Sequence, residues 1–289
     1  MNDATIGIIG GSGLYQIEGL TDVSERSVDT PYGRPSDAIV LGTLKGRRVA
    51  FLPRHGRGHR INPTQVPYRA NIWALKTLGV QRIISVNAVG SLREEMAPMD
   101  IVIPDQLIDR TRHRADTFFE DGIVAHVAFA EPFCAGMRQV ASDVAATTGA
   151  RVHNGGTYVV MEGPQFSTRA ESELYRSWGA AVIGMTALPE AKLAREAEMC
   201  YSVVAFVTDY DCWRPDHDSV TTDMILHNLQ VGAGTARAIV SGIVESLPEE
   251  RSCRCGVALG DGIVTPSHLV PAETRRKLEP IAGRYLDKR

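Results

Sequence analysis

The sequence has no long apolar run and no large excess of charge of either sign. No uninterrupted apolar segment approaches the ~18–20 residues of a membrane-spanning helix, and the N-terminal stretch MNDATIGIIGG lacks the basic, apolar and small-residue regions of a signal peptide. The 289 residues carry a formal net charge of -3, which gives no reason to expect a polyanionic partner. We therefore expect a cytoplasmic protein that binds neither nucleic acid nor membrane.

Cysteine is scarce, and its spacing is not that of a zinc ribbon. The five cysteines are Cys134, Cys200, Cys212, Cys253 and Cys255. An odd set of this kind is typical of reduced structural thiols in a reducing compartment, so no metal site is expected. The pair Cys253 and Cys255 leaves one alternative open, because two cysteines separated by one residue could close a strained disulfide.

Apolar, strand-like runs alternate with segments of helical spacing, which is typical of an α/β protein. The strand-like runs lie at 5–10, 37–42, 47–53, 82–88, 100–106, 156–162, 180–185 and 201–208. The helical patterns lie at about 64–78, 132–149, 168–178, 189–199 and 221–247. The short link TLKG at 43–46 indicates an antiparallel hairpin, so the twisted central sheet is expected to be mixed and flanked by helices.

Neither a composition shift nor a linker divides the chain. We expect a single domain over residues 1–289, in which residues from about 257 to 289 form a C-terminal helical extension packed on the same core. The stretch PAETRRKLEPIAGRYL at 271–286 has the pattern of an amphipathic helix.

Several strand-like runs end in groups that can bind an anion, and open α/β sheets bind ligands beyond the carboxyl ends of their strands. GIIGGSGL at 7–14 offers the backbone N–H groups of a nest around Gly11 and Ser12. Its spacing is neither the Rossmann G-x-G-x-x-G nor a Walker loop. A plain tight turn is the alternative interpretation.

Three further run ends carry hydrogen-bond donors. FLPRHGRGHR at 51–60 places Arg54 and His55 after an apolar run, and an arginine forks onto phosphate, although a solvated basic loop is the alternative. Asn87 and Ala88 follow another run, and Thr186 precedes an expected helix start. No lysine or acidic pair suited to a magnesium–nucleotide complex accompanies them, so the sequence favours free phosphate.

The segment VVMEGPQFSTRAE at 159–171 could bind a flat ligand. Phe166 can stack on such a ligand and Glu162 can accept from hydroxyls, although Phe166 could equally be a core residue. The stretch YSVVAFVTDYDCW at 201–213 ends in two acids, Asp209 and Asp211. A carboxyl in an apolar pocket has a raised pKa and can act as a general acid. In an extended strand the two acids would lie on the same side. A turn-capping role for Asp209 is the alternative.

These motifs together resemble the S-methyl-5′-thioadenosine phosphorylases of the trimeric purine nucleoside phosphorylase superfamily. GIIGGSGL, RHGRGHRINP, NAVGSLRE, MEGPQFSTRAE, GMTALPEAKLARE and TDYDCW occur in this order between residues 6 and 213. The resemblance implies the mixed α/β fold of nucleoside phosphorylases. It also implies phosphorolysis of S-methyl-5′-thioadenosine to adenine and 5-methylthioribose 1-phosphate. Inorganic phosphate would be a co-substrate, no cofactor would be needed, and the chain would form a homotrimer or a dimer of trimers.

The resemblance also assigns roles to individual residues. It implies phosphate contacts from Gly11, Ser12, Arg54, His55, Asn87, Ala88 and Thr186. It implies substrate contacts from Phe166, Ser167, Met185, Asp209, Asp211, Thr222, Ile225, Leu226 and, lent by a neighbouring subunit, His126. Asp209, supported by Asp211, would be the catalytic acid.

Four positions depart from the pattern of the family. Ser12 and Asn87 stand where some members carry threonine, Gly184 replaces an asparagine, and Thr222 is more polar than its counterparts. Two carboxylates suit the 6-amino group of adenine better than a 6-oxo group, because both would only accept hydrogen bonds. A 6-oxopurine nucleoside or S-methyl-5′-thioinosine phosphorylase is the alternative enzyme, and a nucleoside-binding module without turnover is the alternative class.

Overall fold

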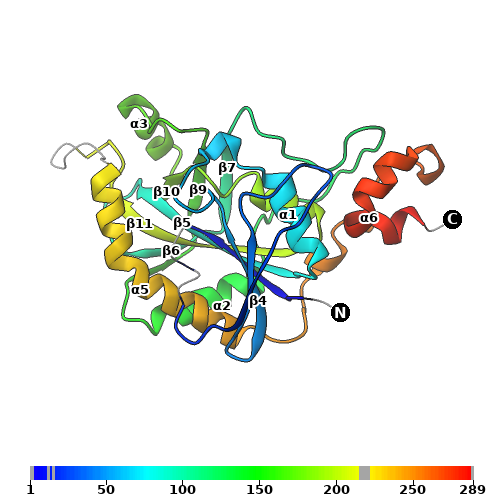
Figure 1. Cartoon of the computed structure of the whole chain (residues 1–289). Helices are drawn as coiled ribbons and strands as arrows, with labels where there is room; N and C mark the ends of the chain where they lie inside the picture. The colour runs from blue at the N-terminus through cyan, green and yellow to red at the C-terminus, as the bar shows by residue number, and fades with distance from the viewer. Residues whose placement is uncertain (1–2, 12–13, 15–16, 215–221, 288–289) are drawn as a thin grey trace.

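The structure, a computed structural model, describes residues 3–11, 14, 17–214 and 222–287 (Figure 1). An 11-stranded mixed sheet forms its centre. The strands are β1 (Ile6–Gly10), β2 (Thr21–Arg26), β3 (Ile39–Leu44), β4 (Arg47–Pro53), β5 (Arg82–Ser91), β6 (Ile101–Ile103), β7 (Gln106–Arg110), β8 (Val152–Asn154), β9 (Thr157–Met161), β10 (Val182–Gly184) and β11 (Cys200–Asp209). The helices are α1 (Tyr68–Thr77), α2 (Ala135–Ala146), α3 (Arg169–Ser177), α4 (Glu190–Glu196), α5 (Thr222–Ser246) and α6 (Ala272–Leu286), with short 3-10 turns η1 (Pro63–Gln65), η2 (Arg254–Val257) and η3 (Ser267–Leu269).

The sheet branches at β5, which has three partners. Its first half pairs in parallel with β1 on one side, and most of its length pairs in parallel with β11 on the other. Near its end, β10 pairs antiparallel with Gly90 and Ser91 and takes the place of β1. The sheet therefore contains both parallel and antiparallel pairs, and the expected mixed α/β architecture is confirmed.

The expected hairpin at 43–46 is also present. β3 and β4 pair antiparallel, and the two residues between them, Lys45 and Gly46, have φ values of 51° and 73°. Positive φ at both central positions defines the turn whose twist matches that of the flanking strands.

Helices cover both faces of the sheet, and β11 contributes to both cores. Val203, Ala205 and Val207 belong to the cluster that includes α1, α4 and α6, whereas Val204 and Phe206 belong to the cluster under α2 and α5. All ten residues of β11 are buried. Burial on both faces explains why this strand reads as a continuous apolar run rather than an alternating one.

The C-terminal segment packs on α1, at the side of the molecule opposite α5 (Figure 1). The indole Nε1 of Trp73 in α1 donates to the carbonyl of Lys277 in α6 at 2.9 Å. Leu278 and Ile281 of α6 are buried in the same cluster as α1. The helix pattern at 271–286 is therefore confirmed as α6.

Three details of the strand assignment were not anticipated. The run at 100–106 is two strands, because Pro104 has no N–H for a ladder hydrogen bond and separates β6 from β7. No sequence pattern marks β2, because all six of its residues are exposed and Val23 is the one apolar residue among them. β8 has only three residues.

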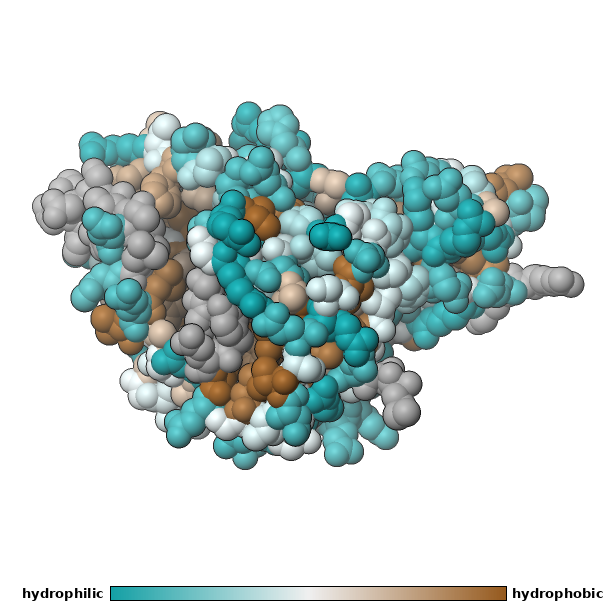
Figure 2. Space-filling view, in the orientation of Figure 1, coloured by the Kyte–Doolittle hydropathy of each residue, from teal (hydrophilic) through white to brown (hydrophobic). Residues whose placement is uncertain are grey.

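The described helices include none that is long and apolar enough to cross a membrane. On the face drawn in Figure 2, hydrophilic residues predominate and apolar residues gather in a hollow beside α5.

Candidate active site

The ends of β1 and β4 meet at one edge of the sheet. Gly10 at the end of β1 lies opposite Pro53 at the end of β4, and the backbone N–H of Arg54 donates to the Gly10 carbonyl at 2.9 Å. Gly11 follows directly and is exposed. Ser12 lies outside the described residues. The predicted convergence of the Gly-rich turn with Arg54 at this edge is therefore observed.

Arg54 is buried and forms an ion pair with Glu190 at the start of α4. Its Nε and Nη2 both bond the Glu190 carboxylate, and the Glu190 side chain is completely buried. Nη2 also donates to the Ser85 hydroxyl at 2.6 Å, and Nη1 donates to the Val86 carbonyl at 3.2 Å. Burial opposes the charge of the guanidinium, but the carboxylate of Glu190 raises the pKa of Arg54 above its ordinary value. The side chain is thus a fixed cation.

Sequence reasoning missed Glu190. The residue lies in the motif GMTALPEAKLARE, directly after Pro189, where it reads as an ordinary first-turn acid of a helix. An acid in a segment whose other residues are mostly apolar was the available signal, because a buried carboxylate requires a partner.

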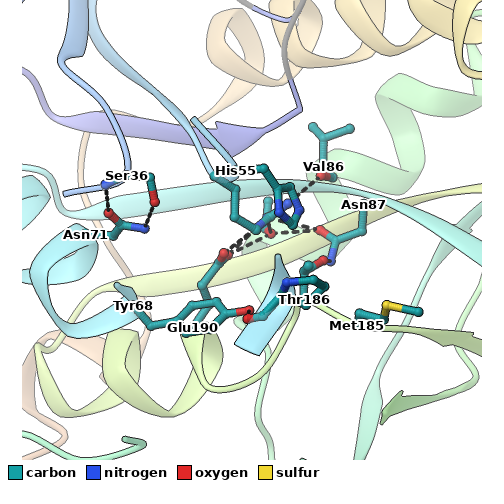
Figure 3. A network of polar contacts seen from close by, with 12 residues as sticks. Ser36, His55, Tyr68, Asn71, Val86, Asn87, Met185, Thr186 and Glu190 are labelled. Atoms are coloured by element: carbon teal, nitrogen blue, oxygen red, sulfur yellow. Dashed lines mark hydrogen bonds and ion pairs between the residues drawn. The ribbon is translucent and has the colours of Figure 1, made fainter. Parts of the chain in front are cut away.

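Asn87 and Thr186 form the second part of this buried polar network around Arg54 (Figure 3). The Asn87 amide donates to the Thr186 hydroxyl at 3.0 Å and to the Tyr158 hydroxyl at 3.3 Å, while its carbonyl accepts from Ser85. Both amide hydrogens are thereby engaged within the protein. Because Thr186 accepts from Asn87, its own hydroxyl proton can point toward an anion.

Gly184 departs from the family pattern, and the structure gives the physical reason. A Cβ at this position would lie 2.4 Å from the Tyr158 hydroxyl. The Tyr158 hydroxyl therefore occupies the space of the missing side chain and supplies a polar group there, bonded to Asn87.

His55 lies beside Arg54 and is held as a neutral imidazole. Its Nδ1 is 2.8 Å from the carbonyl of Ile61, which can only accept, so Nδ1 carries the proton and Nε2 is an acceptor. Burial, reinforced by the charge of Arg54, lowers the pKa of His55 to about 4. Its ring stacks on His59 with centroids 4.3 Å apart.

One side of β5 forms an open floor beside this polar network. Ala88 is exposed and its neighbours Val86 and Gly90 on the same side are partly exposed, whereas the residues between them are buried. Ala88 has no polar side chain, so it can offer a ligand only its backbone.

Asp209 ends β11 and lies against Gly90. Its side chain is enclosed, with a residue exposure of 6%. Oδ1 accepts from the backbone N–H of Asp211 at 2.8 Å, and Oδ2 accepts from the Thr208 hydroxyl at 2.7 Å. Burial raises the pKa of Asp209, and the charge of Asp211 adds to this, while the two hydrogen bonds act in the opposite direction.

A change of register places this carboxylate. Val207 lies opposite Val89 and Asp209 opposite Gly90, so two residues of β11 correspond to one step of β5. Such a bulge redirects a side chain. A Cβ on Gly90 would lie 2.9 Å from Asp209 Oδ1, so the acid occupies the space that a larger residue would fill.

The prediction that Asp211 continues the strand is wrong. β11 ends at Asp209, and Asp211 has a φ of 51°, the left-handed region in which Asp and Asn occur more often than most residues. Its carboxylate accepts from the Ser167 hydroxyl at 2.7 and 2.8 Å. Asp211 thus contacts Asp209 through its backbone and Ser167 through its side chain. The sequence did not reveal this turn, because the feature that marks it is the backbone conformation of Asp211.

Phe166 is not a core residue. The side chain directly precedes Ser167 and is 45% exposed. Glu162 is engaged elsewhere: it accepts from the Thr64 hydroxyl at 2.5 Å and from the Arg112 backbone N–H at 2.6 Å. Burial alone would raise the pKa of Glu162, but these hydrogen bonds hold that pKa below its ordinary value.

Arg114 organises the wall of the site and was not singled out in the sequence. Its fully buried guanidinium donates to the backbone carbonyls of Met185, Leu188 and Glu162, each at 2.6 Å. Met185 packs against Gly163, where a Cβ would lie 2.5 Å from the Met185 sulfur.

The remaining assigned residues do not join this cluster among the described side chains. His126 is exposed, and its backbone N–H donates to Gly262 at 2.8 Å in the C-terminal segment. Thr222, Ile225 and Leu226 belong to the first turns of α5, but their side chains lie outside the described part of the structure.

Comparison with known proteins decides the family. A model of the phosphorylase superfamily matches residues 5–245. A curated S-methyl-5′-thioadenosine phosphorylase from Koribacter versatilis is 59% identical over 98% of this chain and 97% of its own length. The chain belongs to the S-methyl-5′-thioadenosine phosphorylases. The relative of that name from Geobacter sulfurreducens is 56% identical over 98% of this chain and 100% of its own.

Solved structures agree with this family. A methylthioadenosine phosphorylase from an Antarctic soil metagenomic library superposes with a TM-score of 0.93 at 49% identity, over 97% of this chain and 99% of that one. A methylthioadenosine phosphorylase from Schistosoma mansoni in complex with adenine superposes with a TM-score of 0.84 at 36% identity, over 90% and 99%. The fold of this phosphorylase and the resemblance in its motifs are both confirmed.

Proposed function

We propose that this enzyme catalyses the phosphorolysis of S-methyl-5′-thioadenosine, releasing adenine and 5-methylthio-α-D-ribose 1-phosphate. The observation that carries the proposal is that the enclosed carboxyl of Asp209 and the fixed guanidinium of Arg54 both lie along β5, against Gly90 and Val86 respectively. Asp209 lies against Gly90, and Ala88 is two residues earlier in β5. Two residues of a strand span about 7 Å, a distance that a ribose ring can bridge.

Phosphate binds at the strand ends around Arg54. Glu190 holds the guanidinium in place. Nη1 carries two N–H groups, and among the described residues it donates to one acceptor, the Val86 carbonyl. Thr186 donates its hydroxyl, oriented by the Asn87 amide. Neutral His55 accepts a hydrogen bond at Nε2 from the hydroxyl of hydrogenphosphate. Gly11, Ser12 and Ala88 contribute backbone or hydroxyl donors.

The chemical step breaks the bond between ribose C1′ and purine N9. A phosphate oxygen bonds to C1′ while the electron pair of the breaking bond moves onto the purine. Protonated Asp209 donates its proton to N7, so neutral adenine leaves and the carboxylate remains. Proton donation of this kind contributes roughly 10²–10⁴-fold to the rate.

The Thr208 hydroxyl accommodates both protonation states of Asp209. It lies 2.7 Å from Asp209 Oδ2 and 3.3 Å from the Val89 carbonyl. The hydroxyl donates to the carboxylate after proton transfer and can turn to Val89 when Oδ2 carries the proton. Asp211 and Ser167, bonded to each other, accept from the 6-amino group and enclose the base together with Phe166. Met185 packs beside the ribose.

On the assignment that the family resemblance implies, Thr222, Ile225 and Leu226 would contact the 5′-methylthio group, and His126 of a neighbouring subunit would close this end of the site. The exposure of His126, and its backbone bond to the C-terminal segment rather than to the site, support a homotrimer or a dimer of trimers. The reaction needs no cofactor, because the proton donor Asp209 and the phosphate-binding Arg54 belong to the chain and phosphate is a substrate. The five free cysteines support a cytoplasmic location.

A single assay tests the proposed function. Purified enzyme is incubated with S-methyl-5′-thioadenosine, S-methyl-5′-thioinosine or inosine, each with and without phosphate, and the free base is measured. We expect phosphate-dependent release of adenine, with slower release of hypoxanthine. Equal base release without phosphate would indicate a hydrolase, faster hypoxanthine release would favour a 6-oxopurine enzyme, and binding without turnover would leave a nucleoside-binding module.

A further inference from the structure

Four of the five cysteines gather at the end of the sheet far from the active site. Their side-chain sulfurs all lie within 4.8 Å of one another; the cluster consists of Cys134, Cys200, Cys253 and Cys255. Three of the four residues are buried and Cys253 is partly exposed. No disulfide joins any two of them, and all five cysteines of the chain are free thiols.

Three separate segments supply the sulfurs. Cys134 is the N-cap residue of α2, Cys200 is the first residue of β11, and Cys253 and Cys255 flank the start of η2. The backbone fixes this arrangement, since the N–H of Cys134 donates to the Tyr201 carbonyl at 2.9 Å. Long stretches of sequence separate Cys134, Cys200 and the pair Cys253 and Cys255, which is why no metal-binding spacing is visible in the chain.

The distances match those of a tetrahedral metal site. Zinc binds thiolates at about 2.3 Å, so four sulfurs around it lie about 3.8 Å apart. The sulfurs of Cys200 and Cys253 are 3.3 Å apart, and no pair exceeds 4.8 Å. Displacements of about half an ångström would close the tetrahedron around an ion.

The surroundings of the cluster favour thiolates. The N-terminus of α2, which begins after Cys134, carries the positive end of the helix dipole.

A cation also lies close to the cluster. Arg82 of β5 lies opposite Cys200 of β11 and is buried. A buried tetrathiolate with zinc carries a net charge of −2, and a nearby guanidinium offsets part of it.

We propose that this cysteine cluster is a structural zinc site, in which four thiolates bind one Zn²⁺. The role is structural, because β11 runs for ten residues from Cys200 to Asp209, about 30 Å of extended chain. A site with four protein ligands also leaves no open position for a substrate. The ion would fasten the segment around η2 to α2 and to the start of β11.

The experiment uses the full-length enzyme, expressed with zinc in the medium and purified without chelator. Zinc content is measured by mass spectrometry of the metal, and free thiols are counted by alkylation under native and denaturing conditions. We expect about one zinc per chain, with the four cluster thiols protected from alkylation until the protein is denatured. Replacement of zinc by Co²⁺ should produce the charge-transfer bands of a cobalt tetrathiolate.

Variants locate the ion. The double variant Cys253→Ser/Cys255→Ser should lose the zinc, whereas Cys212→Ser, which removes the cysteine outside the cluster, should retain it. If the double variant fails to fold, the cobalt spectrum and the thiol protection of the wild-type protein still decide the question. The proposal is overturned if zinc-supplemented wild type holds less than about a tenth of an ion per chain. It is equally overturned if the native protein shows intramolecular disulfides among these cysteines, which would identify the cluster as a redox-linked staple instead.

Discussion

At the scale of single residues, Arg54 illustrates how one side chain serves stability and binding together. Its guanidinium compensates a completely buried Glu190, so removing it leaves an uncompensated carboxylate in the interior. Breaking a buried pair from one side costs about 3–5 kcal/mol, whereas replacing both partners by apolar residues is often neutral. A loss of activity in an Arg54 variant therefore does not by itself report phosphate binding.

A matched pair of variants separates the two roles of Arg54. We expect Arg54→Leu to lower the free energy of unfolding by about 3–5 kcal/mol, and the double variant Arg54→Leu/Glu190→Leu to recover most of that loss. The apparent affinity for phosphate should stay weak in both. Urea unfolding and the phosphate dependence of adenine release measure the two quantities. Recovery of phosphate affinity in the double variant would show that Arg54 acts on stability alone.

Asp209 carries the second prediction at this scale. Because a general acid must be protonated, kcat/KM for S-methyl-5′-thioadenosine should fall as the pH rises through the raised pKa of Asp209. Asp209→Asn should lower kcat by roughly 10²–10⁴-fold and remove this limb of the profile. Substrate affinity should change much less, since the amide still bonds the base.

Asp211→Asn is the control for Asp209. Its carboxylate bonds Ser167, and its contact with Asp209 is made by its backbone, which the substitution keeps. The fall of kcat/KM with rising pH should therefore persist in this variant. If Asp209→Asn stays within about threefold of the wild-type rate, far from the ~10²-fold minimum, the proton comes from another group.

Asn87 was expected to follow a strand, but it lies inside β5, which continues to Ser91. For Arg54 and Asp209 the sequence alone predicted the strand ends, because run ends are visible as changes from apolar to polar. It could not predict which polar residues pair with each other. Asn87 was expected as a direct phosphate donor, yet both of its amide hydrogens are engaged by Thr186 and Tyr158. Glu190 was not expected at all. Such pairings depend on side-chain geometry across the sheet, which no local pattern encodes.

At the scale of elements, β5 and β11 build the site jointly. β5 provides the open floor and β11 provides the acid, and the bulge before Asp209 directs its carboxylate toward Gly90. The sequence predicted both strands because long apolar runs are reliable signals. The bulge and the left-handed turn at Asp211 were not predictable, because each depends on how one strand pairs with its neighbour.

Gly90 tests this joint construction. Gly90→Ala would place a methyl group 2.9 Å from Asp209 Oδ1, 3.2 Å from Ile183 and 3.3 Å from the Asp211 Cβ. We expect the carboxylate to be displaced, and a displacement of about 1 Å can cost ~10²-fold in rate. Overpacking should also lower stability by about 1–3 kcal/mol.

Gly11→Ala is the matched control for Gly90, because a Cβ there meets no atom of the described residues beyond its chain neighbours within 4 Å. It lies on the phosphate side, so its effect should fall on phosphate affinity rather than on kcat. Steady-state kinetics with both substrates varied would separate the two. A Gly90→Ala enzyme with unchanged kcat would mean that Asp209 is not held as tightly as its contacts indicate.

At the scale of the whole molecule, the C-terminal segment and the loop that carries His126 lie together. The backbone of 124–126 pairs with 262–264, and α6 packs on α1. This supports a single domain in which the extension from about 257 is part of the same core. It also holds His126 at the surface, where a neighbouring subunit could receive it.

The last prediction asks whether His126 serves its own chain or a neighbour. In a cyclic trimer each site would combine the acid of one chain with the histidine of the next. His126→Ala should weaken substrate binding, and Asp209→Asn should abolish most turnover. When the two variants are co-expressed in equal amounts, about a quarter of the sites regain both groups in a randomly mixed trimer. Activity at low substrate should therefore exceed the sum of the two variants assayed separately.

Separately purified variants, mixed just before the assay, provide the control because their subunits have had no chance to exchange. If His126 acted within its own chain, no mixed assembly could restore a complete site, since each chain would still lack one group. Co-expressed protein with only the summed activities of its parents would therefore refute the shared site. Sedimentation of an active monomer would refute it as well. Recovery near the expected quarter, together with a trimer in sedimentation, would instead place His126 in the site of the adjacent subunit.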